Sequence, residues 1–160
     1  MEDEADPARR IHLMDAACGK EISTLPLGEA PRLLEFLPDG NSLIAGNNRS
    51  FHCPDTNTGC ELWSIRHFRA QEPTLKTPIS LAIAEKSGLL AAALTPDSIS
   101  LLEPKTGRVR LELQHPMGHT LRAIGLSPDG TRMIAVGSYI VQVWKLDAVA
   151  DELERQGMNF

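Results

Sequence analysis

Residues 126–146 read LSPDGTRMIAVGSYIVQVWKL and contain the clearest copy of a pattern from which the fold is predicted. The turn sequence Pro128-Asp129-Gly130 is followed after fourteen residues by Trp144, at the end of an apolar segment that starts at Ile140. Short alternating segments bounded by turn residues are typical of β-strands. Because Gly reaches positive φ without steric cost and an Asp side chain bonds nearby amides, the turn predicts a tight hairpin.

The same pattern recurs along the chain. Pro38-Asp39-Gly40 matches the turn above, and Lys86-Ser87-Gly88 lies between the two as a weaker copy. The residues fourteen positions after these three glycines are Pro54, Leu102 and Trp144. An earlier partial copy of the repeat adds Met14 as a fourth equivalent position. With the glycines aligned, Ala45, Ala93 and Ala135 also coincide. Spacings of 40, 48 and 42 residues suit a blade of a β-propeller.

A second turn separates the last two predicted strands of each repeat, and it contains Thr58-Gly59 or Thr106-Gly107. Each repeat therefore has four short strands. The count of predicted strands along the chain is two, four, four and three. Because a four-stranded unit buries both faces only against neighbours, no repeat is expected to fold alone.

These residues resemble the WD40 β-propeller family. Gly118-His119 resembles its Gly-His dipeptide, Ser127-Pro128-Asp129-Gly130 its first hairpin, and Val143-Trp144-Lys145-Leu146 its Trp-Asp strand, with Lys145 in the acidic place. The resemblance covers about residues 9 to 147 and is strongest in the last repeat. It implies a hydrogen-bonded network in which His119 and Trp144 take part, although the turn Gly137-Ser138-Tyr139 lacks the expected Asp.

The sequence therefore predicts an all-β chain, a partial WD40-like propeller of about three to four four-stranded antiparallel blades with a short C-terminal helix. An acidic disordered tail is expected at 1–8 and the repeats at 9–147. Within the repeats, 9–27 is a half blade, 31–66 and 78–115 are blades, and 119–147 is the last blade. Residues 148–160 form the helix and tail, with Asp147 as its cap, Val149 and Leu153 on one face, and Gly157 at its end. The helix is expected to dock on the last blade, since about ten residues are unstable alone.

Composition and charge restrict the function. The chain is 42% hydrophobic, and its net charge of -5 disfavours nucleic acid. The longest apolar run, 89–94, is too short for a membrane span of about twenty residues, and the acidic residues near Met1 do not form an export signal. We therefore expect a cytoplasmic protein whose three cysteines carry no disulfide.

Candidate metal sites fail on spacing. A zinc site at His52, Cys53, Cys60 and His67 is disfavoured, because Cys53 and Cys60 are seven residues apart and adjacent strand residues face opposite ways. Residues 55–59 open like a calcium loop, but Arg66 stands where a bidentate Glu is needed, so a hairpin turn is preferred. No cofactor or metal residues are assigned.

No catalytic residues are assigned either, since the sequence has neither a Gly-x-Ser-x-Gly elbow nor a phosphate-binding loop. The insertion at 66–78, with Phe68, is expected to be a surface loop between blades, and a binding surface is the alternative. The resemblance implies a non-enzymatic protein-protein interaction scaffold, the C-terminal part of a larger β-propeller, with unknown protein partners. Open blade edges favour self-association.

An alternative function comes from the end of the chain. Residues 144–160 also resemble the closing segment of bacterial WD-repeat proteins, which often follow a serine/threonine kinase module. The chain is then a regulatory or sensor region of a kinase-type protein whose catalytic module is absent from it.

Overall fold

The computed structural model describes residues 10–26, 30–47, 49–66, 80–95, 97–114 and 121–157. Three predicted features lie outside these ranges: the acidic tail, the insertion beyond Arg66, and the Gly118-His119 dipeptide with its share of the predicted network.

The described chain forms four antiparallel sheets, in which strands adjacent in sequence are hydrogen-bonded neighbours. The first sheet contains β1 (Arg10–Met14) and β2 (Glu21–Pro26). The second contains β3 (Leu33–Phe36), β4 (Leu43–Gly46), β5 (Ser50–Pro54) and β6 (Glu61–Arg66). The third contains β7 (Leu81–Ile83), β8 (Leu90–Ala92), β9 (Ser98–Leu102) and β10 (Val109–Gln114). The fourth contains β11 (Ala123–Leu126), β12 (Arg132–Val136) and β13 (Val141–Lys145).

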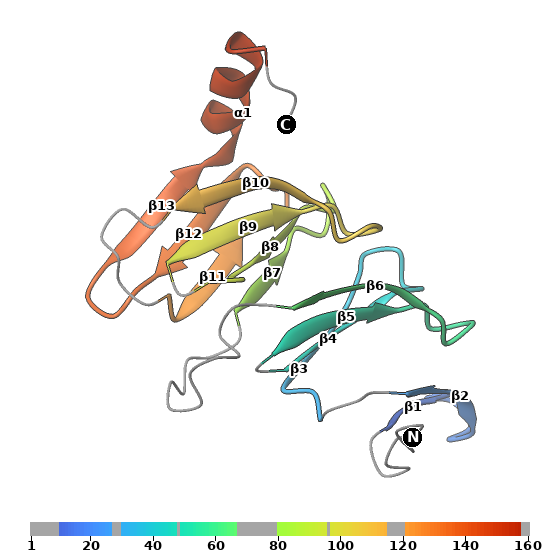
Figure 1. Cartoon of the computed structure of the whole chain (residues 1–160). Coiled ribbons are helices and arrows are strands. Elements are labelled where there is room, and N and C mark those ends of the chain that lie inside the picture. The colour runs from blue at the N-terminus through green and yellow to red at the C-terminus, as the bar shows by residue number, and fades with distance from the viewer. Residues whose placement is uncertain are drawn as a thin grey trace, which may run out of the picture.

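The predicted all-β class is confirmed, as is the count of two, four, four and three strands. Figure 1 shows the sheets following one another in chain order, from the blue two-stranded sheet beside the N-terminus to the orange fourth sheet.

The hairpin between the last two strands is built identically in the first three sheets. Gly19, Gly59 and Gly107 have φ values of 66°, 73° and 68°. In each hairpin the glycine N–H donates to the carbonyl four residues earlier, at 2.8 to 2.9 Å. The predicted Thr-Gly turn is therefore confirmed at Gly59 and Gly107, and Gly19 repeats it.

The hairpin between the first two strands of the second, third and fourth sheets corrects the predicted register of the middle repeat. Its closing bonds run from Leu37 N–H to the Ser42 carbonyl, from Ser127 to Arg132, and from Ala84 to Leu89, which leaves four-residue loops at 38–41, 128–131 and 85–88. Gly40 and Gly130 are third in their loops and bond three residues back, whereas Gly88 is fourth and bonds four residues back to Ala84. Aligning the three glycines was therefore wrong by one residue.

Strand pairing identifies the residues that are equivalent. Ala45 pairs with His52, Ala92 with Ser100, and Ala135 with Gln142. Ala92 is thus the counterpart of Ala45 and Ala135, and the predicted Ala93 was wrong. A longer connection between β8 and β9 restores the register in the next strand. The spacing from Pro54 to Leu102 and from Leu102 to Trp144 therefore stays correct.

Two apolar cores join the sheets. Between the second and third sheets, Ile44, Phe51, Cys53 and Trp63 pack with a set from the third sheet that includes Ala92. Between the third and fourth sheets, the core includes Met133 and Ala135 of the fourth sheet. The third-sheet residues that pack with them are Ala91, Ala93, Ile99, Leu101 and Leu113. Because successive strand residues point to opposite faces, the third sheet is covered on both sides.

The C-terminal helix, α1, spans Leu146–Arg155. It begins at Leu146, so the predicted start at 148 and the cap at Asp147 were wrong: Lys145 is the N-cap and makes no side-chain cap bond. Gly157, with φ 76°, follows the helix as predicted. Among the described residues, the helix docks through its start, where Leu146 is buried and its N–H donates to the Thr131 carbonyl at 2.8 Å; Val149 and Leu153 are half-buried, and the helix projects from the fourth sheet (Figure 1).

Within the described residues, no helix has the length and apolar character needed to cross a membrane.

Candidate functional site

A cavity of about 310 Å³ lies between the second and third sheets, at the ends where their turns meet. Its lining comes from one turn of the second sheet and two turns of the third, with one residue each from β9 and β10: Leu37, Pro38, Asp39, Ser87, Gly88, Leu89, Leu102, Glu103, Pro104, Lys105 and Arg110. Its volume lies at the lower end of the range for small-ligand and side-chain pockets, about 300–1,000 Å³. We call this space the intersheet cleft.

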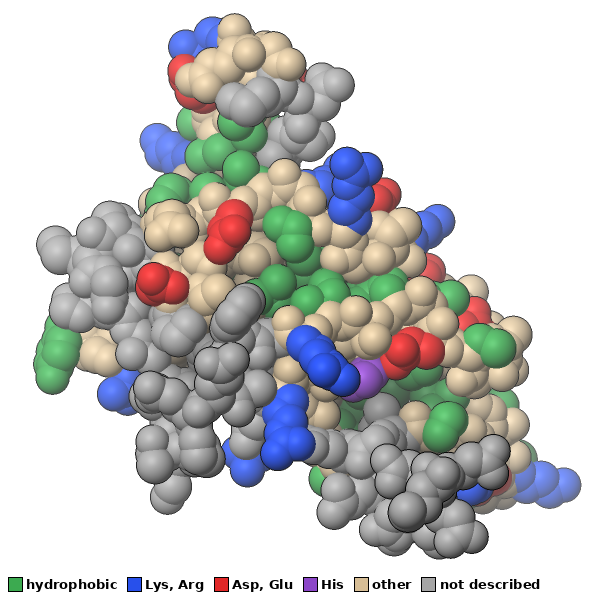
Figure 2. Space-filling model, viewed as in Figure 1, with side chains coloured by type: hydrophobic (Ala, Val, Ile, Leu, Met, Phe, Trp, Pro, Cys, Tyr) green, Lys and Arg blue, Asp and Glu red, His purple; other side chains and the backbone are tan. Residues whose placement is uncertain are grey.

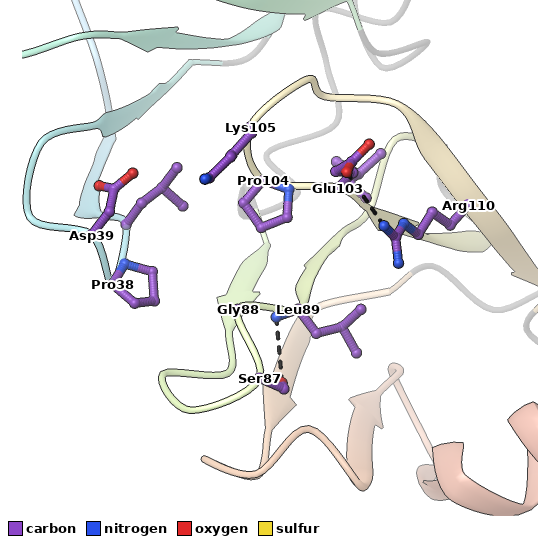
Figure 3. A pocket seen from close by; sticks show the side chains of 11 residues that line it. Pro38, Asp39, Ser87, Gly88, Leu89, Glu103, Pro104, Lys105 and Arg110 are labelled. Atoms are coloured by element: carbon purple, nitrogen blue, oxygen red, sulfur yellow. Dashed lines mark hydrogen bonds and ion pairs between the residues drawn. The ribbon is translucent and has the colours of Figure 1, made fainter.

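The lining of the intersheet cleft contains a set of apolar side chains. Leu37 and Leu102 are buried, and Pro38 and Pro104 approach from facing turns (Figure 3). Proline at these places follows from local structure: Pro38 opens the four-residue hairpin loop, where its fixed φ suits the turn and no amide hydrogen is required. The same residues that shape the turns therefore provide an apolar surface.

Trp63 fixes the two walls of the cleft relative to each other. Its indole Nε1 donates to the carbonyl of Pro104 at 2.7 Å, which ties β6 of the second sheet to a turn of the third. The ring also covers Gly107, where an added Cβ would lie 2.7 Å from the indole Cδ2. Because Trp63 is only 8% exposed, this bond is shielded from water and holds the cleft in one shape.

The two carboxylates at the cleft already have partners. Asp39 Oδ1 accepts the N–H groups of Asn41 and Ser42 at 2.9 and 3.0 Å. Glu103 accepts the Thr106 hydroxyl at 2.9 Å and the Arg110 guanidinium at 3.3 Å. The Thr106 hydrogen bond, with Arg110 nearby, lowers the pKa of Glu103, so this group stays charged near neutral pH.

Lys105 is the second cation of the cleft, beside Arg110. It is exposed, and no hydrogen bond or ion pair joins it to the described residues. In Figure 3 its amine points from the third-sheet turn toward the turn that carries Asp39. The cleft therefore combines an apolar lining with two carboxylates and two cations, of which Lys105 makes no hydrogen bond or ion pair to the described residues.

The polar side chains of the cleft lining are one serine, two carboxylates, one lysine and one arginine. Its one hydroxyl nucleophile, Ser87, accepts the N–H of Leu89 at 3.4 Å, and no histidine is among the lining residues. A serine needs an adjacent base to attack a carbonyl at neutral pH. The lining groups therefore provide contact area and charge.

A polar chain that sequence reasoning missed lies on β5 and β6 of the second sheet. Ser50 Oγ is 2.7 Å from His52 Nε2, and His52 Nδ1 is 2.6 Å from Glu61 Oε2. The hydrogen bond to His52 lowers the pKa of Glu61. The same pairing occurs 40 residues earlier, where His12 Nδ1 is 2.6 Å from Glu21 Oε2. A His followed nine residues later by Glu, twice at one repeat spacing, is the signal that could have revealed it.

The order Ser50, His52, Glu61 resembles a hydrolase triad, but the surroundings differ. Ser50 is 9% exposed, its N–H donates to Asn47 Oδ1 at 2.9 Å, and its carbonyl accepts the Asn47 N–H at 3.0 Å. Acyl transfer needs free donors aimed at the developing oxyanion, and the amide of Ser50 is engaged. None of the three residues lines the intersheet cleft. We interpret the hydrogen-bonded side chains of Ser50, His52 and Glu61 as a brace between β5 and β6.

The residues weighed as zinc ligands are separated by the strand. Cys53 is 0% exposed in the core, and burial raises its pKa to about 12, whereas its neighbour His52 points to the other face and pairs with Glu61. Cys60 is exposed, and His67 lies outside the described residues. Among the described residues, no three His, Cys, Asp or Glu side chains gather as a metal site.

The segment weighed as a calcium loop forms the predicted turn. Asp55 Oδ1 accepts the N–H groups of Asn57 and Thr58 at 2.9 and 2.8 Å, and these bonds lower its pKa, with that of Thr58 the larger. In the fourth sheet, the buried Nε1 of Trp144 has no partner among the described residues. Trp144 is one of the two residues assigned to the hydrogen-bonded network that the resemblance implies. The other, His119, lies outside the described residues.

No protein-family model matches the chain, and no curated protein matches it.

Proposed function

We propose that the chain is part of a WD40-like β-propeller, its C-terminal part, and that it acts as a non-enzymatic protein-protein interaction scaffold. The support is the repeated architecture: antiparallel meanders in chain order, two apolar cores between successive sheets, and one hairpin design used three times. A stack of this kind presents its turns on a rigid support, which suits recognition of another protein.

The intersheet cleft is the observation that carries this proposal. Its walls come from two different sheets and are held together by Trp63, so it is formed before any partner arrives. Preformed sites lose little conformational entropy on binding. Because Lys105 is exposed and makes no hydrogen bond or ion pair to the described residues, its ammonium group can meet a ligand carboxylate, and the cleft favours a peptide segment with a bulky apolar side chain next to a carboxylate.

Selection from a random peptide library on the immobilised chain tests this proposal. We expect enriched peptides that pair an apolar residue with Asp or Glu. By isothermal titration, Lys105→Glu should weaken these peptides roughly tenfold or more, since a hydrogen bond to a charged group contributes about 1.5–3 kcal/mol. Lys20→Glu is the matched control, because Lys20 is an exposed lysine next to the corresponding turn of the first sheet.

Two results would contradict the proposal. Selected peptides that bind the Lys105→Glu variant as tightly as the parent would place the site elsewhere. Turnover of ester or amide substrates that is abolished by His52→Ala and by Ser50→Ala would show that the chain is an enzyme.

A further inference from the structure

Charge is divided between the two ends of the second sheet. Its acidic residues all lie in the half that contains the β3–β4 and β5–β6 turns: Glu35, Asp39, Asp55 and Glu61. Its lysine and arginine residues all lie at the opposite end, which we call the arginine end: Arg32, Arg49 and Arg66. Turn chemistry accounts for Asp39 and Asp55, whose carboxylates accept backbone N–H groups of their own turns. It does not account for the arginines.

The backbone places the three arginines in a row. Arg32 precedes β3, and its N–H donates to the carbonyl of Gly46, the last residue of β4, at 2.7 Å. Arg49 lies in the connection from β4 to β5, and Arg66 ends β6, where it pairs with Ser50. Because neighbouring strands lie about 4.8 Å apart, the four strands place Arg32 and Arg66 about 14 Å apart, with Arg49 between them.

The two outer arginines are accessible. Arg32 and Arg66 are exposed, and no side-chain hydrogen bond or ion pair joins either of them to the described residues. In Figure 2, blue basic side chains gather near the centre of the view, over this end of the second sheet. The acidic residues in the corresponding half of the third sheet are Asp97 and Glu112, and each accepts a hydroxyl of its own sheet, at 2.9 and 2.7 Å. No described carboxylate therefore pairs with Arg32 or Arg66.

The spacing of the arginine end matches that of an extended peptide. A planar guanidinium group forms two parallel hydrogen bonds with one carboxylate, which a lysine ammonium group does not. Along an extended peptide, every second side chain points to the same face, at intervals of about 6.6–6.8 Å. This interval is close to half of the distance between Arg32 and Arg66. Three acidic residues at alternate positions can therefore meet the three arginines one to one.

We propose that the arginine end binds an extended acidic segment of another protein, in which Asp or Glu occupies three alternate positions. This surface lies at the opposite end of the second sheet from Asp39, which lines the intersheet cleft, so it is a second binding surface and does not depend on the cleft. The net charge of -5 repels a long polyanion such as nucleic acid, whereas a short acidic segment meets only the local positive charge.

Fluorescence anisotropy with labelled peptides tests the spacing. One peptide carries Glu-Ser-Glu-Ser-Glu between Gly-Ser flanks, and the other has the same composition with its three glutamates contiguous. Adjacent side chains of an extended peptide point to opposite faces, so the contiguous peptide cannot offer all three carboxylates to one row. We expect the parent chain to bind the alternating peptide roughly threefold or more tightly, and added salt to weaken this binding.

Substitutions at the arginine end test the residues. Arg32→Gln and Arg66→Gln should each weaken the alternating peptide roughly threefold to fivefold, as expected for one exposed ion pair, and the double variant roughly tenfold. Arg132→Gln is the matched control, because Arg132 is an exposed arginine at the first residue of β12, at the turn end of the fourth sheet. It removes the same charge and should keep the parent's affinity. Circular dichroism checks that each variant is folded.

Three results would overturn the proposal. One is equal affinity for the alternating and contiguous peptides. Another is an effect of Arg132→Gln as large as that of Arg32→Gln or Arg66→Gln. The third is a single-stranded oligonucleotide that binds more tightly than the alternating peptide and is weakened by the same two variants, which would identify a polyanion site. Peptides selected for the intersheet cleft should bind both variants as they bind the parent, so failure at one surface is distinguishable from failure at the other.

Discussion

Replacing Gly107 by Ala tests the packing of the third sheet on the second. Gly107 has φ 68°, and an added Cβ would lie 2.7, 2.8 and 3.0 Å from three carbons of the Trp63 ring. Gly19 has nearly the same φ, 66°, at the equivalent turn of the first sheet, with no atom within 4 Å of an added Cβ. The two substitutions therefore share the backbone strain and differ in the contact.

The expected magnitudes follow from these two terms. Holding an L-residue in the left-handed region costs about 1–2 kcal/mol, which is the whole effect expected for Gly19→Ala. Forcing a methyl group against a packed ring adds about 1–3 kcal/mol at Gly107. Moving the ring also weakens the hydrogen bond from Trp63 to Pro104, so Gly107→Ala should be the more destabilising substitution.

Urea unfolding followed by tryptophan fluorescence and circular dichroism measures the difference. With a slope of about 2 kcal/mol per M, the extra contact should lower the midpoint of Gly107→Ala by roughly 0.5–1.5 M relative to Gly19→Ala. Equal midpoints would refute the claim that Trp63 lies on this turn.

Two further predictions concern titratable groups. Because burial raises the pKa of Cys53 to about 12, an aromatic disulfide reagent at pH 8 should label Cys18 and Cys60 at once and Cys53 only after unfolding, and rapid labelling of three thiols would contradict its burial. The pKa of Glu61 is lowered by His52, so its contribution to folding exists above the ordinary pKa of 4.5 and is lost as the pH falls through the lowered value. Glu61→Gln should therefore be less stable than the parent at pH 6, and the two free energies of unfolding should converge on acidification. A constant difference would contradict the pairing.

The sequence was sufficient for the strands and most of the turns, because their signals are local. The Asp-Gly and Thr-Gly turns act through φ and through side-chain bonds to nearby amides, and both appear in the chain as printed. The register of the middle repeat failed for a physical reason. Gly88 closes a loop of the same length as the others but bonds four residues back, and sequence alignment placed it on the glycines that bond three residues back.

The sites depended on contacts that sequence reasoning could not place. Trp63 bonds to Pro104 across 41 residues, and the intersheet cleft exists because turns from two sheets meet there. The helix start was misplaced because Asp147 is a favourable cap by type, whereas the backbone N–H of Leu146 donates to the Thr131 carbonyl and the helix starts two residues before the predicted position.

Equivalent sheets stack on one another through their turns, and nuclear Overhauser effects between these turns can detect that stacking. We expect contacts from the Gly107 α-protons to the Trp63 ring, with those protons shifted upfield by the ring current, and from the Gly130 α-protons to the Ser87 side chain. The first contact joins the second sheet to the third, and the second joins the third to the fourth. Glycine α-protons at unstructured positions, with neither contact present, would contradict the stack.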